Sequence, residues 1–194
     1  MSVSRVSNAT AAPGISGIQV VTPPTVTVSS GTASVSQSGT VSFSGVSTLS
    51  LSNCFSSNYT NYRIGFNLYS ATPTDIFMYF RENTTDKTAG YWGGANSATY
   101  VGSALTGGAN DIGYMYLYQS HNLANYRMSG FIDIYKSANG VQGTIHGTTW
   151  NAYNYRHNTF TYTNNTMSSF NGISLTAYGT TMIGSLQMYG YVGF

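Results

Sequence analysis

From residue 40 onward, apolar and polar side chains alternate with a period of two, which is the repeat of a β-strand. Residues 62–69 show the pattern well, because Tyr62, Ile64, Phe66 and Leu68 all fall on one face of an extended segment. Gly and Asn residues bound the alternating segments, and no segment has helical spacing. The sequence therefore predicts roughly nine or ten short strands and no helix.

The expected strands contain residues 41–43, 49–51, 62–69, 76–81, 112–118, 128–135, 143–150, 153–163, 173–177 and 186–188. The last two are expected to pair around a turn at residues 178–181. Residues 84–110 are rich in glycine and predict a long loop region with one short strand near Tyr100 and Val101. Antiparallel strands at this spacing favour an all-β, two-sheet sandwich, most simply a jelly roll.

The first 40 residues lack this pattern. Ser, Thr, Gly and Ala alternate with isolated valines, and Pro13, Pro23 and Pro24 exclude a helix. We interpret residues 1–40 as an extended N-terminal arm for attachment and residues 41–194 as the jelly-roll domain; a tail without a partner is the alternative. The apolar residues expected to make the attachment are Ile15, Ile18, Val20, Val21, Val26 and Val28.

Charge is scarce and unevenly placed. Only seven Lys or Arg and five Asp or Glu occur in 194 residues, and none lies between Arg5 and Arg63 or after Arg156. A net charge of +2 gives no basic surface for nucleic acid, and no stretch approaches the ~20 apolar residues of a membrane span. We expect much of the surface to be covered by copies of the chain or by a larger assembly. The alternative is that Ser, Thr and Asn side chains alone keep the protein in solution.

Residues that could support catalysis are few. Cys54 follows an apolar strand and is expected to be a buried, unreactive thiol without a disulfide partner. The three histidines lack metal-ligand spacing, and Glu82 with Asp86 reads as a solvated turn. We therefore expect no catalytic residue, cofactor or metal, and no enzyme activity. No secretory signal follows Met1, so synthesis in a cytoplasm is expected.

Two stretches carry a family resemblance. The first is Leu49-Ser-Leu51, followed by Phe55, Tyr59 and the Asn-Tyr-Arg-Ile of residues 61–64. The second is the ending, in which Ile-Ser-Leu-Thr-Ala-Tyr-Gly at 173–179 precedes Gly-Ser-Leu-Gln-Met-Tyr-Gly-Tyr at 184–191. Over roughly residues 40–194 the chain resembles small jelly-roll virion proteins of tailed bacteriophages, with Leu49 where that group has Val.

The resemblance implies a structural protein of the virion, made in the host cytoplasm. Members of that group serve as capsid decoration (cement) proteins or as distal domains of tail fibres. We expect decoration, because 194 residues leave little room for a fibre shaft. The expected partners are the major capsid protein or other virion proteins and further copies of the chain, as a homotrimer.

The alternative function is a receptor-binding, lectin-like fibre domain that recognises a host-surface glycan. Its expected contact residues are Tyr91, Trp92 and Tyr100; the competing interpretation makes Trp92 and Trp150 parts of the core. A secreted carbohydrate-binding or hydrolytic domain is a weaker third possibility.

Tyrosine stripes predict the oligomer surface. Tyr114, Tyr116 and Tyr118 share one face of an expected strand, and Tyr189 and Tyr191 share a face of the last strand. Phenol rings bury a large area at low entropic cost, which suits contact with a sister subunit. The alternative is that these rings simply finish the outer faces and edges of the sandwich.

Overall fold

The computed structural model describes residues 17–99, 104–120, 127–135, 143–152, 155–165 and 169–192. This part of the chain forms sixteen β-strands and no helix, which confirms the all-β prediction. No helix that could span a membrane occurs among these residues. The strands are β1 (Gly17–Val21), β2 (Thr25–Val28), β3 (Thr32–Val35), β4 (Val41–Val46), β5 (Thr48–Ser52), β6 (Asn61–Ser70), β7 (Thr74–Glu82), β8 (Thr85–Asp86), β9 (Tyr91–Thr99), β10 (Ala104–Ile112), β11 (Met115–Ser120), β12 (Met128–Tyr135), β13 (Thr144–Asn151), β14 (Arg156–Asn164), β15 (Gly172–Ala177) and β16 (Met182–Val192).

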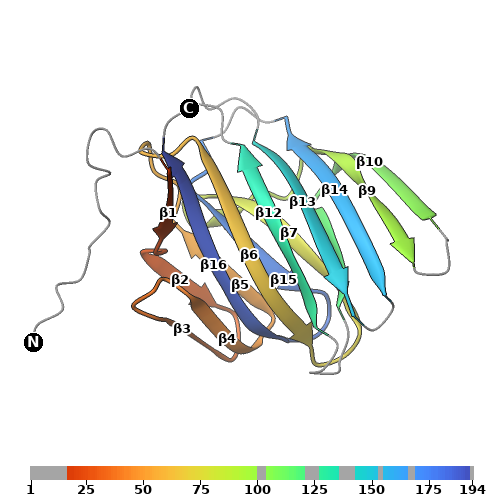
Figure 1. The fold of residues 1–194 in the computed structure, drawn as a ribbon, viewed down its shortest axis with the longest axis horizontal. Coiled ribbons are helices and arrows are strands. Elements are labelled where there is room, and N and C mark those ends of the chain that lie inside the picture. The colour runs from red at the N-terminus through yellow and green to blue at the C-terminus, as the bar shows by residue number, and fades with distance from the viewer. Residues whose placement is uncertain are drawn as a thin grey trace, which may run out of the picture.

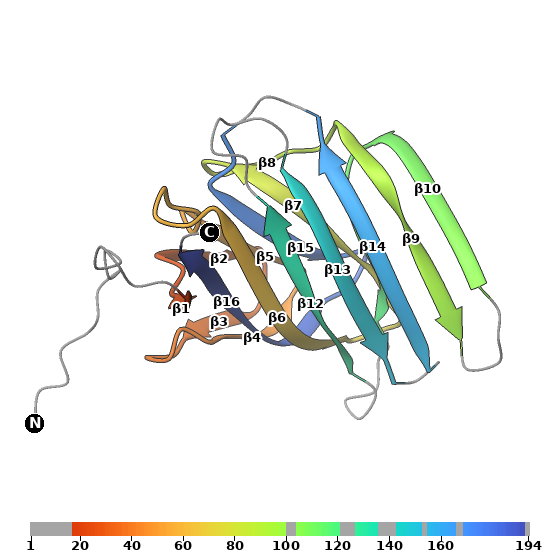
Figure 2. The same cartoon turned by 45° about the horizontal axis from the view of Figure 1, so that its top comes forward.

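The strands form two antiparallel sheets that pack face to face as a sandwich (Figures 1 and 2). Sheet A has the order β10-β9-β14-β13-β12-β6-β16-β4-β3, with β1 paired to the end of β16. Sheet B has the order β11-β7-β15-β5-β2, with β8 paired to β7.

Eight of these strands have the order of a jelly roll. In sheet A, β4-β16-β6-β12 lie side by side, and in sheet B, β5-β15-β7-β11 follow in the matching order. The chain changes sheets within each of the pairs β4/β5, β6/β7, β11/β12 and β15/β16. The expectation that β15 and β16 pair with each other was wrong, because the turn at 178–181 carries the chain from one sheet to the other.

Sheet A continues beyond the jelly roll through β13, β14, β9 and β10, so it is wider than sheet B (Figure 1). The predicted loop at 84–110 was therefore wrong for β8, β9 and β10. In β9 and β10, Gly94 pairs with Gly108 and Gly93 with Ala109. Glycine has no side chain, so this stretch of the sequence shows no alternation of apolar and polar side chains. Tyr100 and Val101 lie outside the described residues.

Residues 17–35 are part of the sandwich. β1 pairs with β16, β2 with β5 and β3 with β4. Three of the predicted attachment residues, Val21, Val26 and Val28, are partly buried and pack against the core. Ile15 lies outside the described residues, and the attachment role of residues 1–40 stays a prediction.

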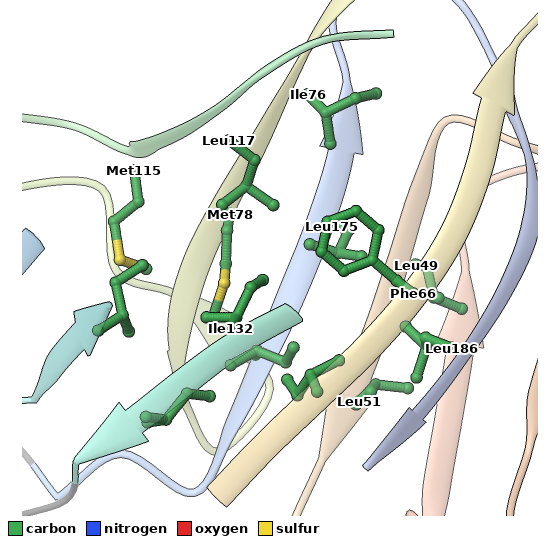
Figure 3. Close-up of a cluster of buried hydrophobic side chains, with 14 of the residues drawn as sticks. Leu49, Leu51, Phe66, Ile76, Met78, Met115, Leu117, Ile132, Leu175 and Leu186 are labelled. Carbon is green, nitrogen blue, oxygen red and sulfur yellow. The ribbon is translucent and has the colours of Figure 1, made fainter. Parts of the chain in front are cut away.

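The core lies between the two sheets (Figure 3). Leu49, Leu51 and Leu175 of sheet B meet Phe66 and Leu186 of sheet A, and all five are nearly or fully buried. Burying each such side chain contributes about 1.5–3 kcal/mol. Other labelled members of the same cluster are Ile76, Met78, Met115, Leu117 and Ile132.

Candidate binding surface

Tyr91 is not a surface residue. Its side chain is fully buried, and its hydroxyl accepts a hydrogen bond from the Phe80 backbone N–H at 2.8 Å and donates one to the Lys87 carbonyl at 3.0 Å. Burial raises the pKa of this phenol above its ordinary value. Tyr91 fixes the β7–β9 corner from inside and cannot touch a glycan.

Both tryptophans are exposed on the outer face of sheet A. Trp92 of β9 exposes 42% of its surface and Trp150 of β13 exposes 47%, which excludes the interpretation that they fill the core. The remaining predicted glycan contact, Tyr100, lies outside the described residues.

Phe131 and Tyr135 of β12 share this outer face, because Ile132 and Ile134, which lie between them, point into the core. We call Trp92, Phe131, Tyr135 and Trp150 the aromatic face. The sequence places Phe131, Tyr135 and Trp150 within expected strands and Trp92 in the glycine-rich stretch expected to be a loop. It does not show that the strands carrying them are neighbours in one sheet, with only β14 and β13 between β9 and β12.

Polar side chains surround Trp150. Across the sheet it lies opposite Ser129 of β12 and His157 of β14, and Ser129 in turn lies opposite Asn67 of β6. The Trp150 and His157 ring centroids are 6.3 Å apart, and His157 Nε2 is 2.6 Å from Thr148 Oγ1. The imidazole is therefore held beside the indole.

Asn67 links two further polar side chains, Ser129 and Arg127. Its amide nitrogen donates to Ser129 Oγ at 2.6 Å, and its carbonyl oxygen accepts from Arg127 Nη1 at 3.0 Å. The Arg127 guanidinium also lies over the Tyr69 ring, 5.0 Å from its centroid. We call Trp150, His157, Asn67, Ser129 and Arg127 the Trp150 platform.

The charge in the middle of the face is neutralised locally. Arg63 of β6 donates to Asp133 of β12 through Nε at 2.6 Å and Nη2 at 2.7 Å. The hydrogen bond that Arg63 donates to Asp133 raises the pKa of Arg63 above its ordinary value. The same guanidinium lies over Phe131, 4.7 Å from the ring centroid. A partner that contacts the middle of this face therefore meets a paired ion and an aromatic ring.

At the β16 end of the face, the structure brings together residues that were predicted for two different roles. Tyr189 lies opposite Val20 and Tyr191 opposite Ile18, since β1 pairs with this part of β16. Ile18 exposes 61% of its surface and Val20 exposes 45%. We call Ile18, Val20, Tyr189 and Tyr191 the β1–β16 patch.

Two further predicted oligomer residues, Tyr114 and Tyr116, lie on the opposite side of the sandwich. Tyr114 and Tyr116 pack around Phe77 of sheet B at ring-centroid distances of 4.2 and 6.0 Å. Tyr118 belongs to β11, but its side chain is outside the description. The four predicted tyrosines whose side chains are described are thus divided between two outer faces. Sequence reasoning missed Tyr178, whose ring centroid lies 5.9 Å from that of Phe77. Tyr178 belongs to a turn, and a turn has no periodic signal.

A groove lies between β1 and the loop of residues 53–59. It has a volume of about 440 Å³, and the thirteen residues that line it carry no Asp, Glu, Lys or Arg. The Tyr59 hydroxyl donates to Gln19 Oε1 at 2.9 Å across this region. Amide and hydroxyl side chains line it together with Val20, Val21 and Pro24, which makes it an uncharged depression.

Groups that could support catalysis are dispersed. Cys54 is buried, and burial raises the pKa of its thiol to about 12, so little thiolate forms near neutral pH. Within the described ranges, no three His, Cys, Asp or Glu side chains gather as metal ligands. His121 lies outside these ranges. The arrangement on sheet A can stack on a partner and form hydrogen bonds with it, which is binding chemistry.

Comparison with known proteins adds no relative: no protein-family model matches the chain, and no curated protein matches it.

Proposed function

We propose that this chain is a structural virion protein of a tailed phage, a capsid decoration or cement protein that acts by contact. The observation that carries the proposal is the β1–β16 patch on the outer face of sheet A, where the exposed Ile18 and Val20 lie opposite Tyr191 and Tyr189. Aliphatic side chains and phenol rings can be buried at low desolvation cost. The resemblance of residues 49–64 and 173–191 to small virion jelly rolls supplies the biological setting.

The β1–β16 patch is the proposed particle contact. Its two aliphatic side chains and two phenols lie beside β1, the strand to which residues 1–16 connect. A contact there continues into the preceding residues, which carry one charged side chain, Arg5. The partner is the major capsid protein or another virion protein, and copies of the chain assemble as a trimer.

Copy number tests the proposal. Quantitative mass spectrometry of purified particles of the encoding phage should find the chain in hundreds of copies. A few tens or fewer would place it in the tail, and its absence from particles would overturn the proposal.

The particle contact is tested separately with a double variant, Ile18→Ser with Val20→Ser, in a particle-binding assay. We expect it to release the protein from particles. The matched control is Tyr178→Ser. It removes a ring on the other side of the sandwich that is more exposed than either Ile18 or Val20. Equal binding by both variants would contradict the assignment of the β1–β16 patch.

A receptor-binding role is the second candidate. The observation that favours it is the exposure of both tryptophans on one outer sheet face, because indole rings are efficient stacking surfaces for ligands. Under this reading, Trp92→Ala weakens binding to host cells, whereas under the decoration proposal it changes particle binding little.

A further inference from the structure

We propose that the Trp150 platform is a binding site for a neutral oligosaccharide, with one sugar ring stacked on the Trp150 indole. Nothing in the decoration proposal requires this site, and it is argued from the geometry around Trp150 alone. The apolar face of a pyranose ring suits a flat aromatic surface, and its hydroxyl groups need hydrogen-bond partners at the rim.

The indole sits on a rigid support. β13 is an interior strand of sheet A, paired along its length with β12 on one side and β14 on the other. Thr149 and Asn151, the neighbours of Trp150 along the strand, are buried on the inner face. A ring carried by such a strand is already ordered before a ligand arrives, so binding costs little conformational entropy.

The rim carries hydrogen-bonding groups of both kinds. Asn67 and Ser129 bring an amide and a hydroxyl, and Arg127 brings guanidinium N–H groups. These three side chains are already linked to one another at 2.6 and 3.0 Å, which fixes their directions. Sugar hydroxyls both donate and accept, so a rim of mixed donors and acceptors matches them.

Charge argues for a neutral ligand. Arg127 is engaged by Asn67 and by the Tyr69 ring, and the Arg63–Asp133 pair is closed on itself. A site for an anionic sugar would instead aim an unengaged cation at the ligand.

The surroundings of the indole also distinguish a sugar from a second protein chain. Across the sheet, Trp150 is flanked by Ser129 and His157, and its outward neighbour toward the start of β13 is Thr148. The centre of a protein–protein interface is an apolar cluster from which polar groups are depleted. An indole bordered by hydroxyl, amide and imidazole groups suits a sugar ring, which needs both a stacking surface and hydrogen-bond partners.

A second ring extends the site. Phe131 lies diagonally across β12 and β13 from Trp150, and diagonal neighbours of this kind are about 7–8 Å apart. Phe131 exposes 37% of its surface and lies against the Arg63 guanidinium. Two neighbouring rings can each stack on a different sugar unit, which favours an oligosaccharide over a monosaccharide.

Intrinsic fluorescence gives a direct test, because the chain contains only two tryptophans. In the Trp92→Phe variant, Trp150 is the sole indole, and its emission should shift to the blue when a sugar covers it. The probes are neutral hexasaccharides built from glucose, mannose, galactose or N-acetylglucosamine. At least one should give a saturable shift at a fixed protein concentration.

The site variant is Trp150→Thr, which keeps a strand-favouring residue on the surface, and isothermal titration calorimetry measures its binding. We expect affinity for the bound hexasaccharide to fall about tenfold or more, equivalent to about 1.4 kcal/mol. Asn67→Ala should weaken it less. Tyr178→Thr is the control, since it removes an exposed ring far from the platform, and should bind as the parent does. Equal thermal unfolding midpoints show that the variants are folded.

Three results would overturn the assignment. The first is that no hexasaccharide binds at millimolar concentration, and the second is that Trp150→Thr binds as tightly as the parent. The third is a Trp150 emission shift that follows protein concentration without sugar, which would assign the platform to a second copy of the chain. These experiments use the purified protein, so their failure leaves the copy-number test of the decoration proposal unaffected.

Discussion

At the residue scale, the closing Tyr-Gly-Tyr of residues 189–191 has a simple physical basis. The two tyrosines point to the outer face, and Gly190 between them points inward toward the Tyr59 ring. A Cβ at position 190 would lie 2.5 Å from Tyr59 Cγ. The missing side chain therefore makes room for Tyr59, whose hydroxyl holds Gln19 of β1.

Gly190→Ala should lower the free energy of unfolding by about 1–3 kcal/mol, because it overpacks a filled space. Urea unfolding followed by circular dichroism measures the change. Gly65→Ala is the matched control, since a Cβ at this strand position has no heavy atom within 4 Å. An equal effect of both substitutions would contradict the role given to Tyr59, and Tyr59→Leu should relieve part of the Gly190→Ala loss.

At the element scale, the three N-terminal strands cover edges that would otherwise be open. β2 lies beside β5, which carries Leu49 and Leu51 into the core, and β3 lies beside β4. Edge strands are protected in this way from pairing with other chains. Residues 17–35 consequently contribute to the fold whatever the role of the residues before them.

Deletion variants separate these two contributions. Removing residues 1–16 should leave the unfolding midpoint unchanged. Removing residues 1–40 should cost roughly 3 kcal/mol or more, because Val21, Val26 and Val28 are each half-buried against the core and contribute about 1 kcal/mol apiece. Urea unfolding of both variants provides the measurement, and a fully stable 1–40 deletion would show that β1–β3 are dispensable.

How well the sequence predicts an element depends on what holds that element in place. Strands such as β6, with large apolar side chains on one face, are predicted from alternation alone. β2 has only valines on its buried face, and β9 pairs with β10 through glycine-rich segments. In those strands the stabilising groups are the backbone and the neighbouring strand, and neither is visible in a local pattern. The Trp150 platform escapes prediction for the same reason, because Asn67, Ser129 and Trp150 meet only through sheet register.

At the scale of the whole molecule, the sandwich buries phenol and thiol groups that can ionise only at a cost. Tyr62 donates to the Ser56 carbonyl at 2.9 Å and accepts from the Ser56 N–H at 2.7 Å. Burial raises the pKa of this phenol from 10.0 to about 12, and raises that of the Cys54 thiol from 9.0 to about 12. In both groups the folded state retains its proton to higher pH than the unfolded state does.

The sign of the pH dependence follows directly. Above the unfolded-state pKa values the unfolded chain binds fewer protons than the folded one, so stability falls as pH rises. The protein should hold its full stability below about pH 9 and lose it progressively toward pH 12. Urea unfolding at fixed pH values measures this loss, and Tyr62→Phe should make it shallower. A stability that stays constant up to pH 12 would show that these groups are not buried in solution.

The widening of sheet A beyond the jelly roll has a consequence for engineering. β9 and β10 form the outermost pair of that sheet, and the eight jelly-roll strands complete their own pairing without them. Growth at a margin leaves the register of the inner strands unchanged. This margin is therefore the place where foreign hairpins can be grafted for display, while the strands that carry Phe131, Tyr135 and Trp150 are left intact.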